Sequence, residues 1–264
     1  HVNKELSSVI SYAPDTYSKS DGELNTAIGN LFADAIYQQT NPIFKTRTNN
    51  EISMVLVNHG GIRAIISEGN ITTRTAYEIM PFENSIVVVE MNGARVNDLI
   101  TYLLKAKRAH PISKLNLTVD LEFNLLNATI KGESIDPNKT YYVATNDYLY
   151  NGGDGMTFFQ PNEGLHVMDY KIRNALLDYF KATDTINPKI DFNVIPTFRN
   201  HSAYDLLVDC LLGSMAVVQE NDWKLYHLNI CFTSQCSSQG VDVSRFTTDA
   251  SVRAVLNLTT TSSC

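Results

Sequence analysis

The sequence has no cysteine in its first 209 residues. All four cysteines lie in the last 55 residues, as Cys210, Cys231, Cys236 and Cys264. The spacing C-x4-C without a nearby pair of histidines is a poor zinc pattern. The cysteines could form two disulfides in an exported protein, or belong to a disordered or non-native extension. Because the only tryptophan, Trp223, also lies here and no proline follows Pro196, we predict a boundary near Asn200. Residues 1–200 would form one domain, and residues 201–264 a cysteine-containing tail.

Other absences narrow the class of protein. No apolar run approaches the roughly 20 residues of a transmembrane helix. Acidic residues outnumber basic ones, 28 to 21, and the net charge of -7 argues against a surface for nucleic acid or anionic membrane. The chain opens His1-Val2-Asn3-Lys4-Glu5, with neither a starting methionine nor a signal peptide, so we interpret it as a processed or partial product.

What is present is an ordinary globular composition, with 44% hydrophobic and 19% charged residues. Apolar residues at helical spacing predict helices over 21–41, 96–104 and 168–182, the first ended by Asn41-Pro42. Alternating or continuous apolar runs predict strands at 53–57, 85–91, 115–123, 128–130 and 141–144. The two kinds of element do not alternate regularly. The predicted fold class is therefore α+β, a mixed sheet covered by helices on both faces.

The stretch from Thr140 to Phe159 holds the most informative loop. The buried strand 141–144 is followed by the polar pair Asn146 and Asp147, then by Tyr148 and the glycine-rich run 151–155. Three glycines let the backbone approach a ligand closely. They leave Asp154 as the only charge in the loop. One ring and one carboxylate suit a planar ligand that stacks and donates hydrogen bonds. The alternative is a β-turn in which Asp154 and the glycines serve only geometry.

Two further loops lie beside predicted strands: NHGGIR at 58–63 and PFEN at 81–84. The three loops together supply two aromatic rings, a carboxylate, a guanidinium and two amides, namely Phe82, Tyr148, Asp154, Arg63, Asn58 and Asn84. Two rings can sandwich a base, an acid can accept from ribose, and an arginine can serve a phosphate. Taken singly, Phe82 could be plain core and Arg63 a surface ion pair.

Six blocks in this order resemble the C-terminal, substrate-binding domain of the 5′-nucleotidase family. They are NHGGIR at 58–63, GNIT at 69–72, PFEN at 81–84, VVVEMNG at 87–93, IDPNKTY at 135–141 and ATNDYLYNGGDG at 144–155. GNLFADAI at 29–36 matches the family's first helix, so the resemblance covers about residues 3–195 and leaves out the tail.

The resemblance implies a role for each site residue. Phe82 and Tyr148 match the two rings that clamp the nucleobase, and Asn84 matches the amide that contacts it. Asp154 matches the ribose-binding acid. On the phosphate side, the matching residues are Asn58 and Arg63.

The chain departs from the family pattern at three positions. His59 replaces the first glycine of the NGGGIR block, and we expect it to be a tolerated surface residue. An arginine that the family carries before its first helix falls here on Gly22, with Lys19 the nearest base. Tyr148 stands for the usual phenylalanine, a mild change because the ring is retained.

The resemblance also implies where the catalysis lies. The family cleaves phosphoesters with two metal ions held by an N-terminal metallophosphatase domain, whose D-x-H, G-N-H and G-H-x-H blocks do not occur here. We therefore predict no catalytic residue, metal ligand or cofactor in this chain, and divalent metal ions in a partner domain.

The predicted function is a nucleotide- or nucleoside-binding domain of a 5′-nucleotidase. It would position the nucleotide for a metallophosphatase domain that is upstream in a longer precursor or a separate chain. The resemblance implies a periplasmic, cell-surface or secreted location. One alternative is a stand-alone nucleoside- or nucleotide-binding protein without turnover; a second is a degenerate product kept only for interaction.

Overall fold

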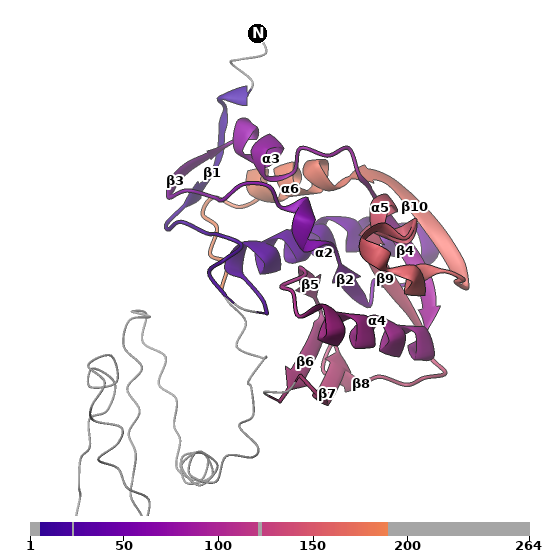
Figure 1. The fold of residues 1–264 in the computed structure, drawn as a ribbon. Coiled ribbons are helices and arrows are strands. Elements are labelled where there is room, and N and C mark those ends of the chain that lie inside the picture. The colour runs from indigo at the N-terminus through magenta and orange to yellow at the C-terminus, as the bar shows by residue number, and fades with distance from the viewer. Residues whose placement is uncertain (1–5, 23, 121–122, 190–264) are drawn as a thin grey trace, which may run out of the picture. The chain divides into compact units, whose positions relative to one another are not determined.

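The computed structural model describes residues 6–22, 24–120 and 123–189 (Figure 1). The predicted boundary near Asn200 and the tail lie outside these residues. The helices are α2 (Ala27–Thr48), α3 (Thr73–Ile79), α4 (Gly93–Ala106), α5 (Asp147–Tyr150) and α6 (Ile172–Lys181), with the short 3-10 helices η1 (His59–Gly61), η2 (Gly153–Gly155) and η3 (Thr157–Phe159). The strands are β1 (Val9–Ala13), β2 (Met54–Leu56), β3 (Gly69–Thr72), β4 (Ser85–Asn92), β5 (Ile112–Ser113), β6 (Leu115–Val119), β7 (Leu125–Ile130), β8 (Glu133–Ser134), β9 (Thr140–Asn146) and β10 (Gly164–Lys171).

The central sheet has five strands in the order β10-β4-β9-β2-β5. Strands β2 and β9 are parallel, while the other neighbours are antiparallel, so the sheet is mixed. A three-stranded sheet, β6-β7-β8, and a two-stranded sheet, β1-β3, accompany it.

Both faces of the central sheet are covered. Along β4, Ile86 and Val88 join a core cluster with residues of α2, α3 and α6, whereas Val87 and Val89 join a second cluster with residues of α4. This division follows from the alternation of side chains along a strand. Figure 1 accordingly shows α2 and α4 on opposite sides of the sheet. The α+β prediction, with helices on both faces, is confirmed.

The prediction that the first helix ends at Asn41-Pro42 is wrong. Helix α2 begins after Thr26, whose side chain accepts a hydrogen bond from the Gly29 amide, and it continues through Pro42 to Thr48. A proline inside a helix removes one backbone hydrogen bond. Here Phe44, shortly after the proline, is completely buried, and burying a phenylalanine stabilises by about 1.5–3 kcal/mol. The helix ends instead at Asn49, which adopts the left-handed conformation.

The predicted helix over 168–182 is also partly wrong. Residues up to Lys171 belong to β10, and α6 begins at Ile172. Met168 is buried as a core-facing strand residue, so an apolar position common to both patterns extended the predicted helix too far. Strand β1, which pairs with β3, was not predicted at all.

The topology brings three chain segments to one edge of the sheet. Because β2 and β9 are parallel, both end at this edge, and antiparallel β4 begins there, with Ile86 opposite Asn146. The segments 57–63, 81–84 and 146–155 therefore meet. Within the described residues, no helix combines the length and apolarity that spanning a bilayer would require.

Candidate functional site

The loops that carry the predicted site residues are joined to one another by direct contacts. The Asn146 carboxamide donates to Asn58 Oδ1 at 3.1 Å, which ties 146–155 to 58–63. Asn84 Nδ2 donates to Asp147 Oδ1 at 2.8 Å, which ties 81–84 to the same segment. The structure thus brings the three predicted loops together.

Arg63 connects the 58–63 loop directly to the 81–84 loop and to the end of α3. Its backbone amide donates to the Ile79 carbonyl at 2.8 Å, and its guanidinium lies over the Phe82 ring, 5.8 Å from the centroid. Arg63 also donates weakly to the Gly60 carbonyl at 3.5 Å. Among the described residues Arg63 forms no ion pair, and its guanidinium lies over an aromatic ring instead.

Asn146 and Asp147 are the connecting residues, and the sequence assigned them no role. Asn146 is buried, and its Oδ1 also accepts from the Leu149 amide at 2.7 Å, capping α5. Asp147 accepts from the Ser85 amide at 3.0 Å in addition to Asn84. The signal in the sequence was the abrupt change to polar residues directly after a buried strand. Such residues satisfy the backbone groups that a strand leaves at its end.

The two predicted clamp rings are exposed to solvent. Phe82 is 43% exposed and Tyr148 is 46% exposed. Large aromatic side chains supply much of the apolar area buried in protein cores. Because Phe82 leaves 43% of its surface exposed, the alternative that it is plain core is wrong.

Tyr148 and Asp154 form a hydrogen-bonded pair. Tyr148 Oη donates to Asp154 Oδ1 at 2.9 Å, and this bond is the main reason why the pKa of Tyr148 is raised. The ring also lies against Gly153, where an added Cβ would come within 2.5 Å of the ring carbon Cε1. Gly153 is therefore needed for the close approach of Tyr148 to the loop.

The backbone of Asp154 is left-handed, with φ 53°. Non-glycine residues seldom adopt this conformation, although Asp and Asn tolerate it better than most. The Asp154 carbonyl accepts a hydrogen bond from Tyr102 Oη of α4 at 2.8 Å. Asp154 is thus bonded through its carboxylate to Tyr148 and through its carbonyl to Tyr102.

His59 is more than the tolerated surface residue that we expected. Its backbone amide donates to His110 Nδ1 at 3.3 Å, and its own Nδ1 lies 3.0 Å from the Ala109 carbonyl oxygen. These contacts join the 58–63 loop to the segment after α4. They span about fifty positions of the chain, so local spacing could not predict them.

His110 is only 4% exposed, and burial is the main cause that lowers its pKa to about 4. The imidazole is therefore neutral at pH 7. Because Nδ1 accepts from His59, the proton is on Nε2, which is buried and has no hydrogen-bond partner among the described residues. No motif in the sequence singles out this residue.

Lys19, the base expected nearest to the missing arginine, does reach the site loops. Its ammonium donates to the Ile62 carbonyl at 3.1 Å. It therefore contributes a positive charge beside the 58–63 loop.

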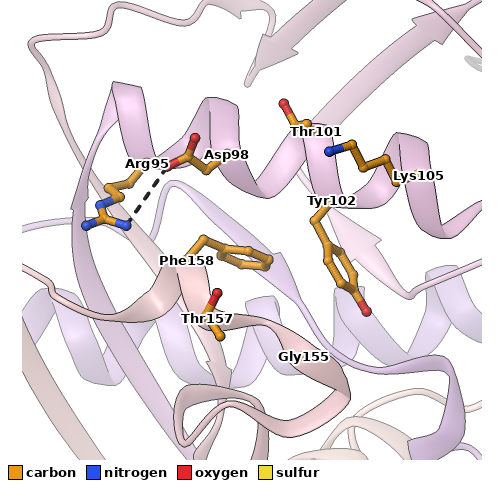
Figure 2. Close-up of a pocket in the computed structure, with 8 residues that line it drawn as sticks. All are labelled: Arg95, Asp98, Thr101, Tyr102, Lys105, Gly155, Thr157 and Phe158. Atoms are coloured by element: carbon orange, nitrogen blue, oxygen red, sulfur yellow. Dashed lines mark ion pairs between the residues drawn. The ribbon is translucent and has the colours of Figure 1, made fainter.

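A cavity of about 260 Å³ lies behind the glycine-rich loop, between α4 and the residues that follow Asp154 (Figure 2). It is lined by Arg95, Asp98, Thr101, Tyr102, Lys105, Gly155, Thr157 and Phe158. None of the six predicted site residues lines it. The described part of the chain also contains no group of three or more His, Cys, Asp or Glu that could hold a metal ion.

Comparison with known proteins identifies the fold and the family. Among solved structures, the chain is similar to a 5′-nucleotidase precursor from Thermus thermophilus, with a TM-score of 0.62 and 24% identity, covering 73% of this chain and 40% of that one. Among curated proteins, it is 27% identical over 184 residues to an apyrase of Tabanus yao, covering 60% of this chain and 32% of the apyrase. It is 38% identical over 99 residues to protein UshA of Salmonella pullorum, covering 36% of this chain and 18% of UshA.

The chain therefore spans a third or less of the length of these two curated relatives. The family described as “5'-nucleotidase, C-terminal domain” matches residues 7–161, more than half of the chain, and includes all three site loops. In this family the catalytic metal site lies in the N-terminal domain. This chain belongs to the 5′-nucleotidase C-terminal domain family.

Proposed function

We propose that this domain binds a nucleotide or nucleoside at the sheet edge where the three loops meet. The observation that carries the proposal is the linkage of these loops by Asn146 and Asp147, with the Phe82 and Tyr148 rings left exposed. Both rings lie on loops that hydrogen bonds join to one another, and both are more than 40% exposed. Exposed rings of this kind suit stacking on a flat ligand.

The polar groups around the rings suit the rest of a nucleotide. Asp154 Oδ1 accepts from Tyr148, and within the described residues no hydrogen bond to Oδ2 is present, so that oxygen is available to a ribose hydroxyl. A carboxylate that accepts from hydroxyl groups makes strong, charge-assisted hydrogen bonds. Arg63, together with Asn58, would face the phosphate. The side-chain Nδ2 of Asn84 donates to Asp147, which leaves the side-chain oxygen Oδ1 of Asn84 to accept from the base.

We further propose that the domain positions its ligand for hydrolysis by a metallophosphatase domain. The described residues offer no three-ligand metal group, so the residues here do not fit a metal site of the kind that activates water. The domain would work with a catalytic domain upstream or in a separate chain, in the periplasm, at the cell surface or in the secreted fraction. The alternative is a stand-alone nucleoside- or nucleotide-binding protein without turnover.

Calorimetric titration with AMP tests the binding. Phe82→Ala should weaken AMP binding by roughly 1–3 kcal/mol, the usual contribution of a ring stacked on a base. Tyr12→Ala is a matched control, because Tyr12 is similarly exposed, at 41%, but lies on β1. Equal binding by Phe82→Ala and the unaltered protein would show that the ligand site is elsewhere.

Phosphate release distinguishes the two functions. We expect the pure protein to bind AMP without hydrolysing it in Mn²⁺, and hydrolysis to appear when a metallophosphatase domain is supplied. Metal-dependent hydrolysis by the pure protein would contradict the proposal that a separate metallophosphatase domain carries out the catalysis. Binding with no hydrolysis in either case would favour the stand-alone binding protein.

A further inference from the structure

Tyr102 reaches the glycine-rich loop from helix α4. Figure 2 shows its side chain projecting from α4 beside Gly155, and its hydroxyl donates to the Asp154 carbonyl at 2.8 Å. Tyr102 and Asp154 are 52 positions apart in the chain. No motif links them, and the resemblance assigns Tyr102 no role.

The Tyr102 ring packs against two aromatic neighbours, one in η3 and one in the segment after α4. Its centroid is 5.5 Å from that of Phe158 and 5.9 Å from that of His110, tilted against both. His110 is in turn held by the His59 amide. Burial, followed by the charge of Asp154, raises the pKa of Tyr102, so its hydroxyl remains a hydrogen-bond donor at neutral pH.

Asp154, the acceptor of this hydrogen bond, is the one non-glycine residue of the 151–155 run with a positive φ. Asp154 is left-handed with φ 53°, a conformation that is unfavourable for a residue with a side chain. Inside the loop, the Gly155 and Met156 amides donate to the Gly152 and Gly153 carbonyls. The Gly155 amide and the Asp154 carbonyl share one planar peptide group, so this group is bonded within the loop through its N–H and to Tyr102 through its carbonyl. The Tyr102 hydroxyl therefore anchors the Asp154 backbone from outside the loop.

We propose that Tyr102 is a positioning residue for nucleoside binding: it holds the Asp154 backbone so that the carboxylate meets the ribose hydroxyls. This inference rests on the proposed function. It predicts an effect specific to the sugar, because Tyr102 acts on Asp154 and is bonded neither to Phe82 nor to Tyr148.

Tyr102→Phe tests the proposal, since it removes the hydroxyl and keeps the ring packed on Phe158. We expect calorimetry to show about a 2- to 10-fold loss of affinity for adenosine, the effect of one lost hydrogen bond, and less than about a 2-fold loss for adenine. Tyr170→Phe is the matched control. It removes a hydroxyl that donates to Asp178 Oδ2 at 2.7 Å, away from the loop, and should leave both affinities unchanged.

The amide NMR signals of Gly152, Gly153 and Gly155 provide a readout that does not depend on the ligand. They should shift in Tyr102→Phe and stay in place in Tyr170→Phe. Unshifted glycine signals, or equal losses for adenosine and adenine, would overturn the positioning role while leaving the proposed function standing. If the unaltered protein bound no adenosine, the proposed function would fail, and ribose positioning with it; shifted glycine signals would then show only that Tyr102 orders the loop.

Discussion

The hydroxyl of Tyr148 donates to the carboxylate of Asp154, with 2.9 Å between Oη and Oδ1. In the proposed site, the residue that stacks on the base is thus bonded to the residue that accepts from the ribose. The resemblance to the family leads us to expect a phenylalanine at this position, and a phenylalanine has no hydroxyl with which to make this bond. In the proposed site, the Tyr148 hydroxyl would occupy Asp154 Oδ1, an oxygen that could otherwise accept from a second ribose hydroxyl, while Oδ2 stays available to the first.

Tyr148→Phe should release Asp154 Oδ1 while keeping the stacking ring. We expect adenosine to bind about 2- to 10-fold more tightly, since one competing hydrogen bond of ordinary strength is removed. Adenine, which has no ribose, should bind as before. Calorimetry with both ligands measures the difference. Weaker adenosine binding would instead mean that the Tyr148 hydroxyl orients the carboxylate for the ligand.

His110 should make the free energy of unfolding depend on pH. Its folded pKa of about 4 lies below the ordinary value of 6.5. As the pH falls below 6.5, His110 becomes protonated in the unfolded chain but stays neutral in the folded protein. The stabilisation is therefore complete above about pH 6.5 and is lost as the pH falls toward 4, with roughly 2 kcal/mol lost at pH 5.

Urea unfolding of the unaltered protein and of His110→Asn at pH 7.5 and pH 5 measures this loss. Asparagine does not titrate, and its carbonyl oxygen can still accept from the His59 amide. The unaltered protein should lose about 2 kcal/mol more than the variant between the two pH values. Equal losses would show that His110 titrates normally in the folded protein.

Gly93→Ala should destabilise the domain at the start of α4, the helix that carries Tyr102. An added Cβ would overlap the backbone carbonyl of Asp136 and come within 2.9 Å of Pro137 Cα. These are backbone atoms that cannot rotate away, so we expect a loss of about 2–4 kcal/mol in the free energy of unfolding.

Gly60→Ala is the control for this substitution. The nearest atom to its added Cβ would be Asn58 Nδ2 at 3.4 Å, at the end of a flexible side chain. It should change the unfolding free energy by less than about 1 kcal/mol. Similar urea midpoints for the two variants would contradict the account of Gly93.

The sequence predicted the parts of this fold that local patterns encode. The continuous apolar run over residues 86–89 indicated a buried strand at 85–91, and β4 confirms it. Helix α2 passes through Pro42 because the buried side chain of Phe44 lies beyond the proline. A local stop signal contains no information about such tertiary packing.

In the candidate site, too, local motifs were predicted from the sequence and contacts between distant residues were not. Its three loops were predicted because each carries a motif directly beside a strand. Tyr102, His110 and the bonds made by Asn146 were not predicted, because each depends on a partner that only the fold brings near. Whether residues 201–264 are a separate tail remains a prediction, outside the described residues.

The central claim is that Asp154 recognises the sugar of a nucleoside held between Phe82 and Tyr148. Asp154→Asn tests it most directly, because asparagine tolerates the same left-handed backbone and keeps the carbonyl that Tyr102 binds. Calorimetry should show adenosine binding about 10- to 100-fold more weakly, as expected when hydrogen bonds to a charged acceptor are lost, with adenine binding unchanged. An equal loss for adenosine and adenine, or no loss for either, would contradict the claim.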